Sequence, residues 1–142
     1  MATIVVGSDH AGFDLKEAIK AYLVEKGYEV DDVGAHSKDP VDYPIIAKTA
    51  AAKVAKTGNL GILVCGTGIG MCMAANKVKG VRAALCYDEE TAKLAREHNN
   101  ANILCLGSRT EPARFFKKIL RSFLATQFSA EERHHKRVSL IE

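Results

Sequence analysis

Tryptophan is absent from this 142-residue sequence, and aromatic residues make up only 6% of it. No apolar run approaches the ~18 residues of a membrane-spanning helix, and the N-terminus lacks the basic and apolar segments of a secretory signal peptide. The four cysteines form no CxxC pair and no other zinc-like spacing. We therefore expect a cytoplasmic protein with reduced thiols, without a membrane anchor, a disulfide framework or a zinc ribbon.

A strong excess of one charge is also missing, because the net charge is only +3. So small an excess argues against an obligate nucleic-acid-binding protein. The positive charge is concentrated toward the C-terminus, since residues 109–142 contain eight Lys and Arg against four Asp and Glu. This distribution is compatible with a local anion-binding site and equally with a solvated helix face.

The remaining composition is typical of a globular chain, with 47% hydrophobic and 26% charged residues. The length predicts a single domain over residues 1–142. Five segments of strand length occur at residues 3–8, 28–33, 60–65, 81–86 and 102–107. Most of them are apolar without polar alternation, as parallel strands buried on both faces are. Asp31 and Asp32 make the second segment the exception and place it at an edge of the sheet.

Helical patterns alternate with these strands. Pro44 begins the second helix, a short one follows the glycines after Cys65, another covers residues 88–98, and the last has its apolar stripe within residues 116–124. The first helix has apolar residues on one face and charged residues elsewhere, at Lys16, Glu17 and Lys20. The alternation predicts an α/β fold, a three-layer α/β/α sandwich with a five-stranded parallel Rossmann-like sheet. Ligands of such folds bind outside the carboxyl ends of the strands, near the switch point in strand order.

Three alternate glycines follow the third strand, in the segment Cys65-Gly66-Thr67-Gly68-Ile69-Gly70. Glycines allow a tight turn that directs successive N–H groups to one point near a helix N-terminus, which forms an anion hole. The spacing matches neither a dinucleotide-binding fingerprint nor a P-loop, and a plain glycine-rich connector is the alternative. At the edge of such a hole Cys65 is either a thiolate base or nucleophile, or a buried structural thiol. Cys86 and Cys105 lie in apolar runs, and we expect them in the core.

Two histidine motifs lie at the ends of predicted elements. His98-Asn99-Asn100 ends a helix, where the helix C-terminus favours the protonated imidazole that a general acid needs. A solvent-facing helix cap is the alternative. Asp9-His10 follows the first strand and allows the same two interpretations, since Asp9 can simply begin the next helix.

Basic residues cluster near the C-terminus in the segment Arg133-His134-His135-Lys136-Arg137. If this segment is helical, Arg133 and Arg137 share one face and can hold a phosphate between two guanidinium groups. A solvated tail with Glu131 and Glu132 as counter-charges is the alternative. No aromatic residues interleave to stack on nucleic-acid bases, and the five histidines share no metal-ligand spacing. We therefore expect neither nucleic acid nor a metal ion here.

Together these motifs resemble those of the ribose-5-phosphate isomerase B family, in the group of sugar-phosphate isomerases that also includes galactose-6-phosphate isomerase subunits. The resemblance covers nearly the whole chain, with matching segments in order at residues 7–12, 42–44, 61–70, 74–77, 80–83, 96–102, 107–109, 133–134 and 137–138. It implies interconversion of ribose 5-phosphate and ribulose 5-phosphate without a metal or organic cofactor. It also implies a homodimer, or a tetramer of paired dimers, with sites completed across the subunit interface.

The resemblance implies a role for each residue of the site. Cys65 is the base that moves a proton between C1 and C2 of the sugar through an enediolate. The amides of residues 66–70 stabilise the negative oxygen, and the Thr67 hydroxyl helps to move the oxygen-bound proton. His98 opens the furanose ring, and Asp9 and Asn99 hold sugar hydroxyls. The phosphate is bound by His10, Arg109, Arg133 and Arg137, with Tyr43 and His134 as further candidates.

One departure from the family's pattern concerns the phosphate end. The family usually has two glycines before the Arg-His motif, where this chain has Glu131 and Glu132. Carboxylates at these positions can pair with Arg133 or Arg137 and weaken phosphate binding. Two alternative functions remain open: isomerisation of a six-carbon aldose phosphate such as allose 6-phosphate, and non-catalytic binding of an anion or sugar phosphate.

Overall fold

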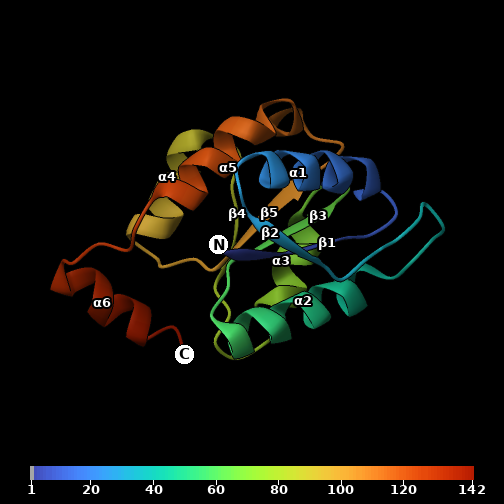
Figure 1. Ribbon diagram of the computed structural model, residues 1–142. Coiled ribbons are helices and arrows are strands. Elements are labelled where there is room, and N and C mark those ends of the chain that lie inside the picture. The colour runs from blue at the N-terminus through green and yellow to red at the C-terminus, as the bar shows by residue number, and fades with distance from the viewer. Residues whose placement is uncertain (1) are drawn as a thin grey trace.

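A five-stranded parallel sheet forms the centre of the molecule in the computed structural model, which describes residues 2–142 (Figure 1). The strand order is β2-β1-β3-β5-β4. Its strands are β1 (Thr3–Ser8), β2 (Glu29–Asp32), β3 (Gly61–Cys65), β4 (Ala83–Leu85) and β5 (Ile103–Gly107). The helices are α1 (Phe13–Glu25), α2 (Tyr43–Thr57), α3 (Ile69–Ala75), α4 (Glu89–Glu97), α5 (Phe116–Ala125) and α6 (Glu132–Ser139), with a 3₁₀ turn at Glu111–Phe115.

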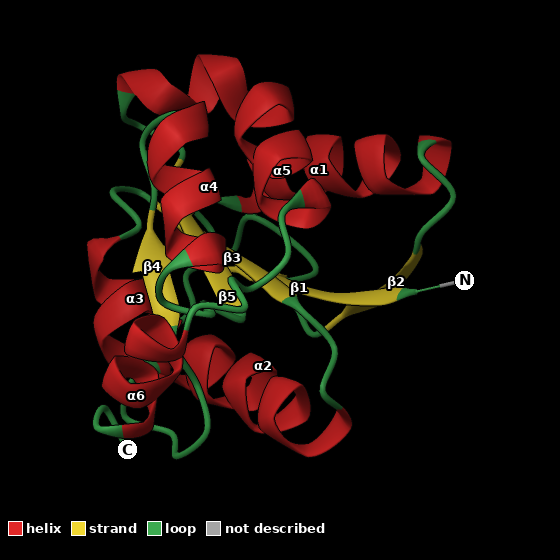
Figure 2. Cartoon of the chain, turned by 90° about the vertical axis from the view of Figure 1, so that its left-hand side faces the viewer, coloured by secondary structure: helices red, strands yellow, loops and turns green. Residues whose placement is uncertain are grey.

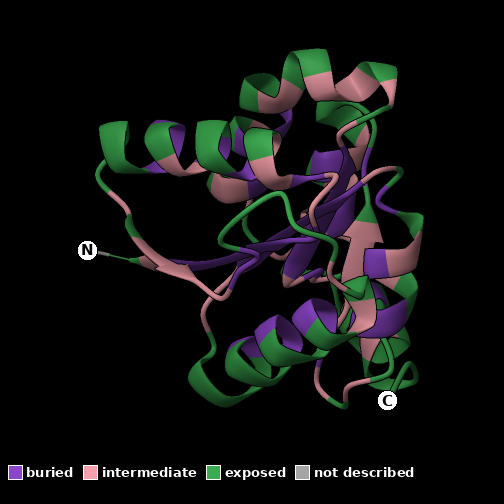
Figure 3. Ribbon diagram, turned by 90° about the vertical axis from the view of Figure 1, so that its right-hand side faces the viewer, coloured by how far each residue is buried: buried purple, intermediate pink, exposed green. Residues whose placement is uncertain are grey.

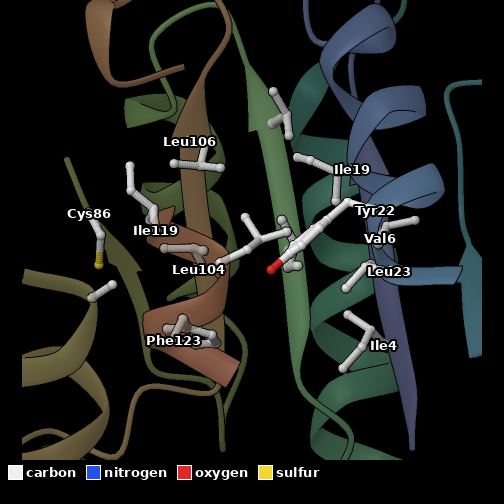
Figure 4. Packing of buried hydrophobic residues seen from close by; sticks show 14 of the residues in the cluster. Ile4, Val6, Ile19, Tyr22, Leu23, Cys86, Leu104, Leu106, Ile119 and Phe123 are labelled. Carbon is white, nitrogen blue, oxygen red and sulfur yellow. The ribbon is translucent and has the colours of Figure 1, made fainter. Parts of the chain in front are cut away.

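Helices cover both faces of the sheet, so the predicted three-layer α/β/α sandwich is confirmed (Figure 2). Alternate residues of β1, such as Ile4 and Val6, belong to one hydrophobic cluster with residues of α1 and α5, seen from close by in Figure 4. Val5 points to the opposite face, where it joins a second cluster with residues of α2 and α3. The two clusters explain why the central strands are apolar without alternation, since both of their faces are buried (Figure 3).

The predicted strands are all present, with ends trimmed by one or more residues in four of them. β2 is an edge strand, as Asp31 and Asp32 predicted, and β4 forms the other edge. The predicted start of α4 is confirmed by a capping box, in which the Asp88 carboxylate accepts a hydrogen bond from the Thr91 amide at 2.7 Å. Among residues 2–142 no helix is long and apolar enough to cross a membrane.

The expectation that Lys16 lies away from the buried face of α1 is wrong. Its side chain is only 1% exposed, and its ammonium donates to both carboxylate oxygens of Asp32, at 2.8 and 2.6 Å. Lys20 donates to the same carboxylate at 2.8 Å. Burial alone would raise the pKa of Asp32, but the hydrogen bonds from Lys16 and Lys20 hold that pKa below its ordinary value. The polar edge strand β2 is thus tied to α1 by an ion-pair cluster.

Candidate active site

The switch point in strand order lies between β1 and β3, because the chain continues from β1 to one edge and from β3 toward the other. Asp9 follows β1 directly, and Cys65 is the last residue of β3. A cavity of about 420 Å³ opens between them, lined by Asp9, Tyr43, Cys65, Gly66, Thr67, Ile69, Gly70 and Met73. Thus the glycine segment lies at the place where α/β sheets bind ligands.

The glycine segment turns back on the thiol of Cys65. Gly68 has a φ of +80°, a left-handed conformation that glycine adopts without strain. Its amide donates to the Cys65 sulfur at 3.1 Å, and the Ile69 amide donates to the Thr67 hydroxyl at 3.2 Å. The amides of Thr67 and Gly70 have no acceptor within residues 2–142. The loop therefore places a hydrogen-bonded thiol beside backbone donors that are free to bind an anion.

The side chains of Asp9, just after β1, and of Tyr43, the first residue of α2, form the opposite wall of the cavity. The Asp9 carboxylate, largely buried, accepts a hydrogen bond from the Gly12 amide at 3.0 Å through one oxygen. Tyr43 packs its ring against the backbone of Gly70, where an added Cβ would come within 2.5 Å of the ring. Both residues therefore face the start of α3 from the other side of the switch point.

His10 and Arg109 also lie at the carboxyl end of the sheet, after β1 and β5. The Nδ1 atom of His10 accepts a hydrogen bond from the Val41 amide at 3.1 Å, so its proton is on Nε2, which is left to donate. The Arg109 amide donates to the Gly66 carbonyl at 2.9 Å, and its guanidinium lies beside the same glycine. A cation and an N–H donor thus flank the glycine segment.

The other expected site residues form a second group, at the opposite end of the sheet. His98 caps the C-terminus of α4, and its ring stacks on that of His134 in α6, with centroids 4.2 Å apart. Burial lowers the pKa of His134, and the neighbouring His98 and Arg133 lower it further. Arg133 and Arg137 lie on the same short helix, which Figure 1 shows set apart from the sheet below α4.

Strand register shows how far the two groups are separated. β3 and β5 are parallel, with Gly61 opposite Ile103 and Cys65 opposite Gly107. Cys65 is therefore at the carboxyl end, whereas His98 precedes Ile103 and lies beyond the amino end. The strand between them spans roughly 13 Å. One chain does not bring Cys65 and His98 together.

A larger cavity of about 560 Å³ lies at the amino end of the sheet and includes Asn99 and Arg82 in its lining. Arg82 is occupied there by hydrogen bonds to the Asn100 carbonyl and to Glu142. Neither a thiol nor a histidine lines this cavity. The chemistry therefore favours the smaller cavity at Cys65 as the reactive half of the site. Within residues 2–142, no three His, Cys, Asp or Glu side chains are grouped to hold a metal ion.

The sequence profile of the Ribose/Galactose Isomerase family matches residues 4–141. The chain belongs to this family. It is 44% identical to the Escherichia coli ribose-5-phosphate isomerase B, over 99% of this chain and 95% of the relative. The structure of the Trypanosoma brucei type B ribose 5-phosphate isomerase superimposes with a TM-score of 0.94 at 46% identity, covering 99% and 97% of the two chains. The Mycoplasma genitalium ribose-5-phosphate isomerase B, solved with bound ribulose-5-phosphate, gives a TM-score of 0.92 at 47% identity, covering 98% and 93%.

Membership of the ribose/galactose isomerase family confirms the predicted resemblance and the predicted fold. The roles of individual residues stay predictions. Sequence reasoning missed Met73, which lines the Cys65 cavity and is 67% exposed. The signal was available, because Met73 lies four residues after Ile69 and therefore on the same face of α3.

Proposed function

We propose that the protein interconverts D-ribose 5-phosphate and D-ribulose 5-phosphate as an aldose-ketose isomerase. The observation that carries this proposal is the Cys65 thiol, which lies beside free backbone amides in the cavity at the switch point. Its relatives named ribose-5-phosphate isomerase B support the choice of a five-carbon sugar phosphate. The reaction is a step of the pentose phosphate pathway.

In the proposed mechanism Cys65 acts as the base. Its thiolate removes the proton from C2 of the open-chain aldose, and the electron pair moves to the carbonyl oxygen at C1 to give an enediolate. Return of the proton to C1, with transfer of the oxygen-bound proton from O2 to O1, yields the ketose. Negative charge develops on oxygen in the transition state, and each preorganised donor there can contribute about 3 kcal/mol. The free amides of the glycine segment are placed to supply such donors.

The remaining residues bind and open the sugar. The Thr67 hydroxyl accepts a hydrogen bond from the Ile69 amide, so its own proton is left to take part in the transfer between O2 and O1. Asp9 has a carboxylate oxygen left for a sugar hydroxyl. His98, as acid and base, opens the furanose ring, with Asn99 holding a second hydroxyl. The phosphate is bound by cationic and N–H donors: His10, Arg109, Arg133 and Arg137.

A complete site of this kind needs a second copy of the chain. Cys65 and His98 lie at opposite ends of one sheet, so each site combines the Cys65 end of one subunit with the His98 end of another. We therefore propose a homodimer, or a tetramer built from dimers, in which residues 1–142 form one domain. We place the enzyme in the cytoplasm, acting on a small sugar phosphate rather than on nucleic acid or membrane.

The test is an assay of ketose formation. Purified protein is incubated with ribose 5-phosphate in the presence of EDTA, and allose 6-phosphate serves as the comparison substrate. We expect ribulose 5-phosphate to form at a rate that EDTA does not change. Absence of turnover on ribose 5-phosphate, or a higher kcat/KM on allose 6-phosphate, would contradict the proposal.

A further inference from the structure

The guanidinium of Arg133 is occupied by a carboxylate from the same segment of chain. Its Nε donates to Oε2 of Glu131 at 2.7 Å, and the same oxygen lies 3.5 Å from Nε2 of His134. Arg133 holds the pKa of Glu131 below its ordinary value, so the carboxylate is ionised at neutral pH. An anion therefore already neutralises one of the cations assigned to the substrate phosphate.

His134 does not compete for this carboxylate as a second cation. Burial lowers the pKa of His134, and the neighbouring His98, Arg133 and Arg137 lower it as well. The imidazole is therefore neutral at neutral pH, where its ring stacks on that of His98. Arg133 is thus the main positive charge that Glu131 faces.

We propose that the Glu131 carboxylate is an internal competitor of the substrate phosphate, which must displace it from Arg133 on binding. This inference rests on the proposed function, in which Arg133 binds the phosphate of a sugar phosphate. Carboxylate and phosphate oxygens use the same guanidinium N–H donors, so the two anions exclude each other there. The phosphate carries the greater charge and replaces Glu131. Its affinity for the site is reduced, because binding must first break the ion pair between Arg133 and Glu131.

The exposure of the pair sets the size of the effect. The side chains of Arg133 and Glu131 are 61% and 59% exposed. Exposed ion pairs are weak, and one at the upper end of their range corresponds to about a fivefold change in an equilibrium constant. Removal of the carboxylate should therefore strengthen phosphate binding by about two- to fivefold.

Neighbouring glutamates allow a matched experiment. Glu131→Gln removes one negative charge and keeps the length of the side chain, and the Glu131 side chain makes no capping bond to α6, so the helix should remain intact. Glu132→Gln removes the same charge one position away, where no ion pair is formed within residues 2–142. The affinity for inorganic phosphate is measured by calorimetry, the KM and kcat for ribose 5-phosphate by ketose formation, and folding by circular dichroism.

We expect Glu131→Gln to lower both the phosphate Kd and the KM by about two- to fivefold with kcat unchanged, and Glu132→Gln to change each less than twofold. In an Arg133→Ala background the effect of Glu131→Gln should disappear. Equal effects of the two glutamine variants, weaker phosphate binding in Glu131→Gln, or an undiminished effect without Arg133 would each overturn the inference. Glu131→Ala is a second variant that also removes the carboxylate, and the same results are expected from it as from Glu131→Gln.

The calorimetric readout separates this inference from the proposed function. A wild-type protein without isomerase activity would refute the proposed function, while tighter phosphate binding by Glu131→Gln would still support the competition at Arg133. Conversely, normal turnover with unchanged Kd and KM in Glu131→Gln would refute the competition alone.

Discussion

At the level of single residues, the Cys65 thiol differs from the other three thiols in having a loop amide as its hydrogen-bond donor. Cys86 and Cys105 are buried in the core, as their apolar surroundings predicted. Cys65 is also buried, so its exposure does not distinguish a structural thiol from a base. The cavity and the free amides beside it support the proposed role of Cys65 as a base.

Replacement of Cys65 with alanine tests the assigned base. We expect kcat to fall by at least about 100-fold, because general-base catalysis contributes this much or more. Binding should change far less, since phosphate contacts set it. Deuterium from heavy water should enter C2 of the aldose with the wild type and not with the variant. Near-normal turnover and exchange in Cys65→Ala would assign the proton transfer to another group.

Cys72 is the thiol that chemical modification must distinguish from Cys65. A hydrogen bond from Cys105 lowers the pKa of Cys72 to about 7, against the effect of burial. Burial raises the pKa of Cys86 to about 12. In a Cys65→Ala background we expect iodoacetamide to label Cys72 with a rate that rises through pH 7, while Cys86 stays unlabelled, as measured by mass spectrometry. Equal labelling of the two would be inconsistent with these shifts. Cys72→Ala should keep kcat within several-fold of wild type.

At the level of elements, the hydrophobic pattern predicted the five strands, because burial on both faces leaves a strong signal. The same pattern, together with Pro44, the glycines after Cys65 and the charged ends of α4, predicted the helices that cover the sheet. The burial of Lys16 was not predicted. A lysine buried by an ion pair with Asp32, on a strand far away in sequence, leaves no periodicity to detect. The 3₁₀ turn at Glu111–Phe115 was also not predicted, and the helix at residues 116–124 is not the last one, because α6 follows it. The site motifs were predicted because their residue types suggest the chemistry and because they follow the strands and helices in the sequence. Their separation at two ends of the sheet was not predicted, since it depends on the strand register.

The Lys16–Asp32 pair should contribute to stability in a pH-dependent manner. Asp32→Asn leaves a buried lysine without its main partner, and we expect the free energy of unfolding to fall by about 3 kcal/mol at pH 7. The pKa of Asp32 is lowered in the folded state, so its contribution is complete above the ordinary carboxyl pKa and is lost as the pH falls through the lowered value. The difference between wild type and variant should therefore shrink below about pH 4.

Asp31 offers the matched control for this measurement. It precedes Asp32 in β2 and pairs with Lys53 at 2.9 Å, with both side chains more than a third exposed. Asp31→Asn should cost at most about 1 kcal/mol in urea unfolding at pH 7. Equal losses in the two variants would show that burial of Lys16 adds nothing to the pair.

At the level of the whole molecule, the parallel sheet fixes which functional groups one chain can bring together. The carboxyl ends of strands β1 and β3 lie side by side, so Asp9, His10 and the glycine segment converge there. α4 returns the chain to the amino end of the strands, where His98 lies beside α6 and its arginines. In the proposed dimer, the two incomplete half-sites of each chain would form two complete sites when two copies associate about a twofold axis.

Mixing two inactive variants tests this assembly. Cys65→Ala and His98→Asn each damage both sites of their own homodimer. In a mixed dimer one site carries both substitutions and the other carries neither, so that random pairing should restore about a quarter of wild-type activity. The two proteins are unfolded together, refolded and assayed for ketose formation, with each variant refolded alone as the control. If the mixture shows only the sum of the two controls while light scattering detects dimers, Cys65 and His98 do not act in one site across the interface. A monomer with full activity at micromolar concentration would contradict the shared site altogether.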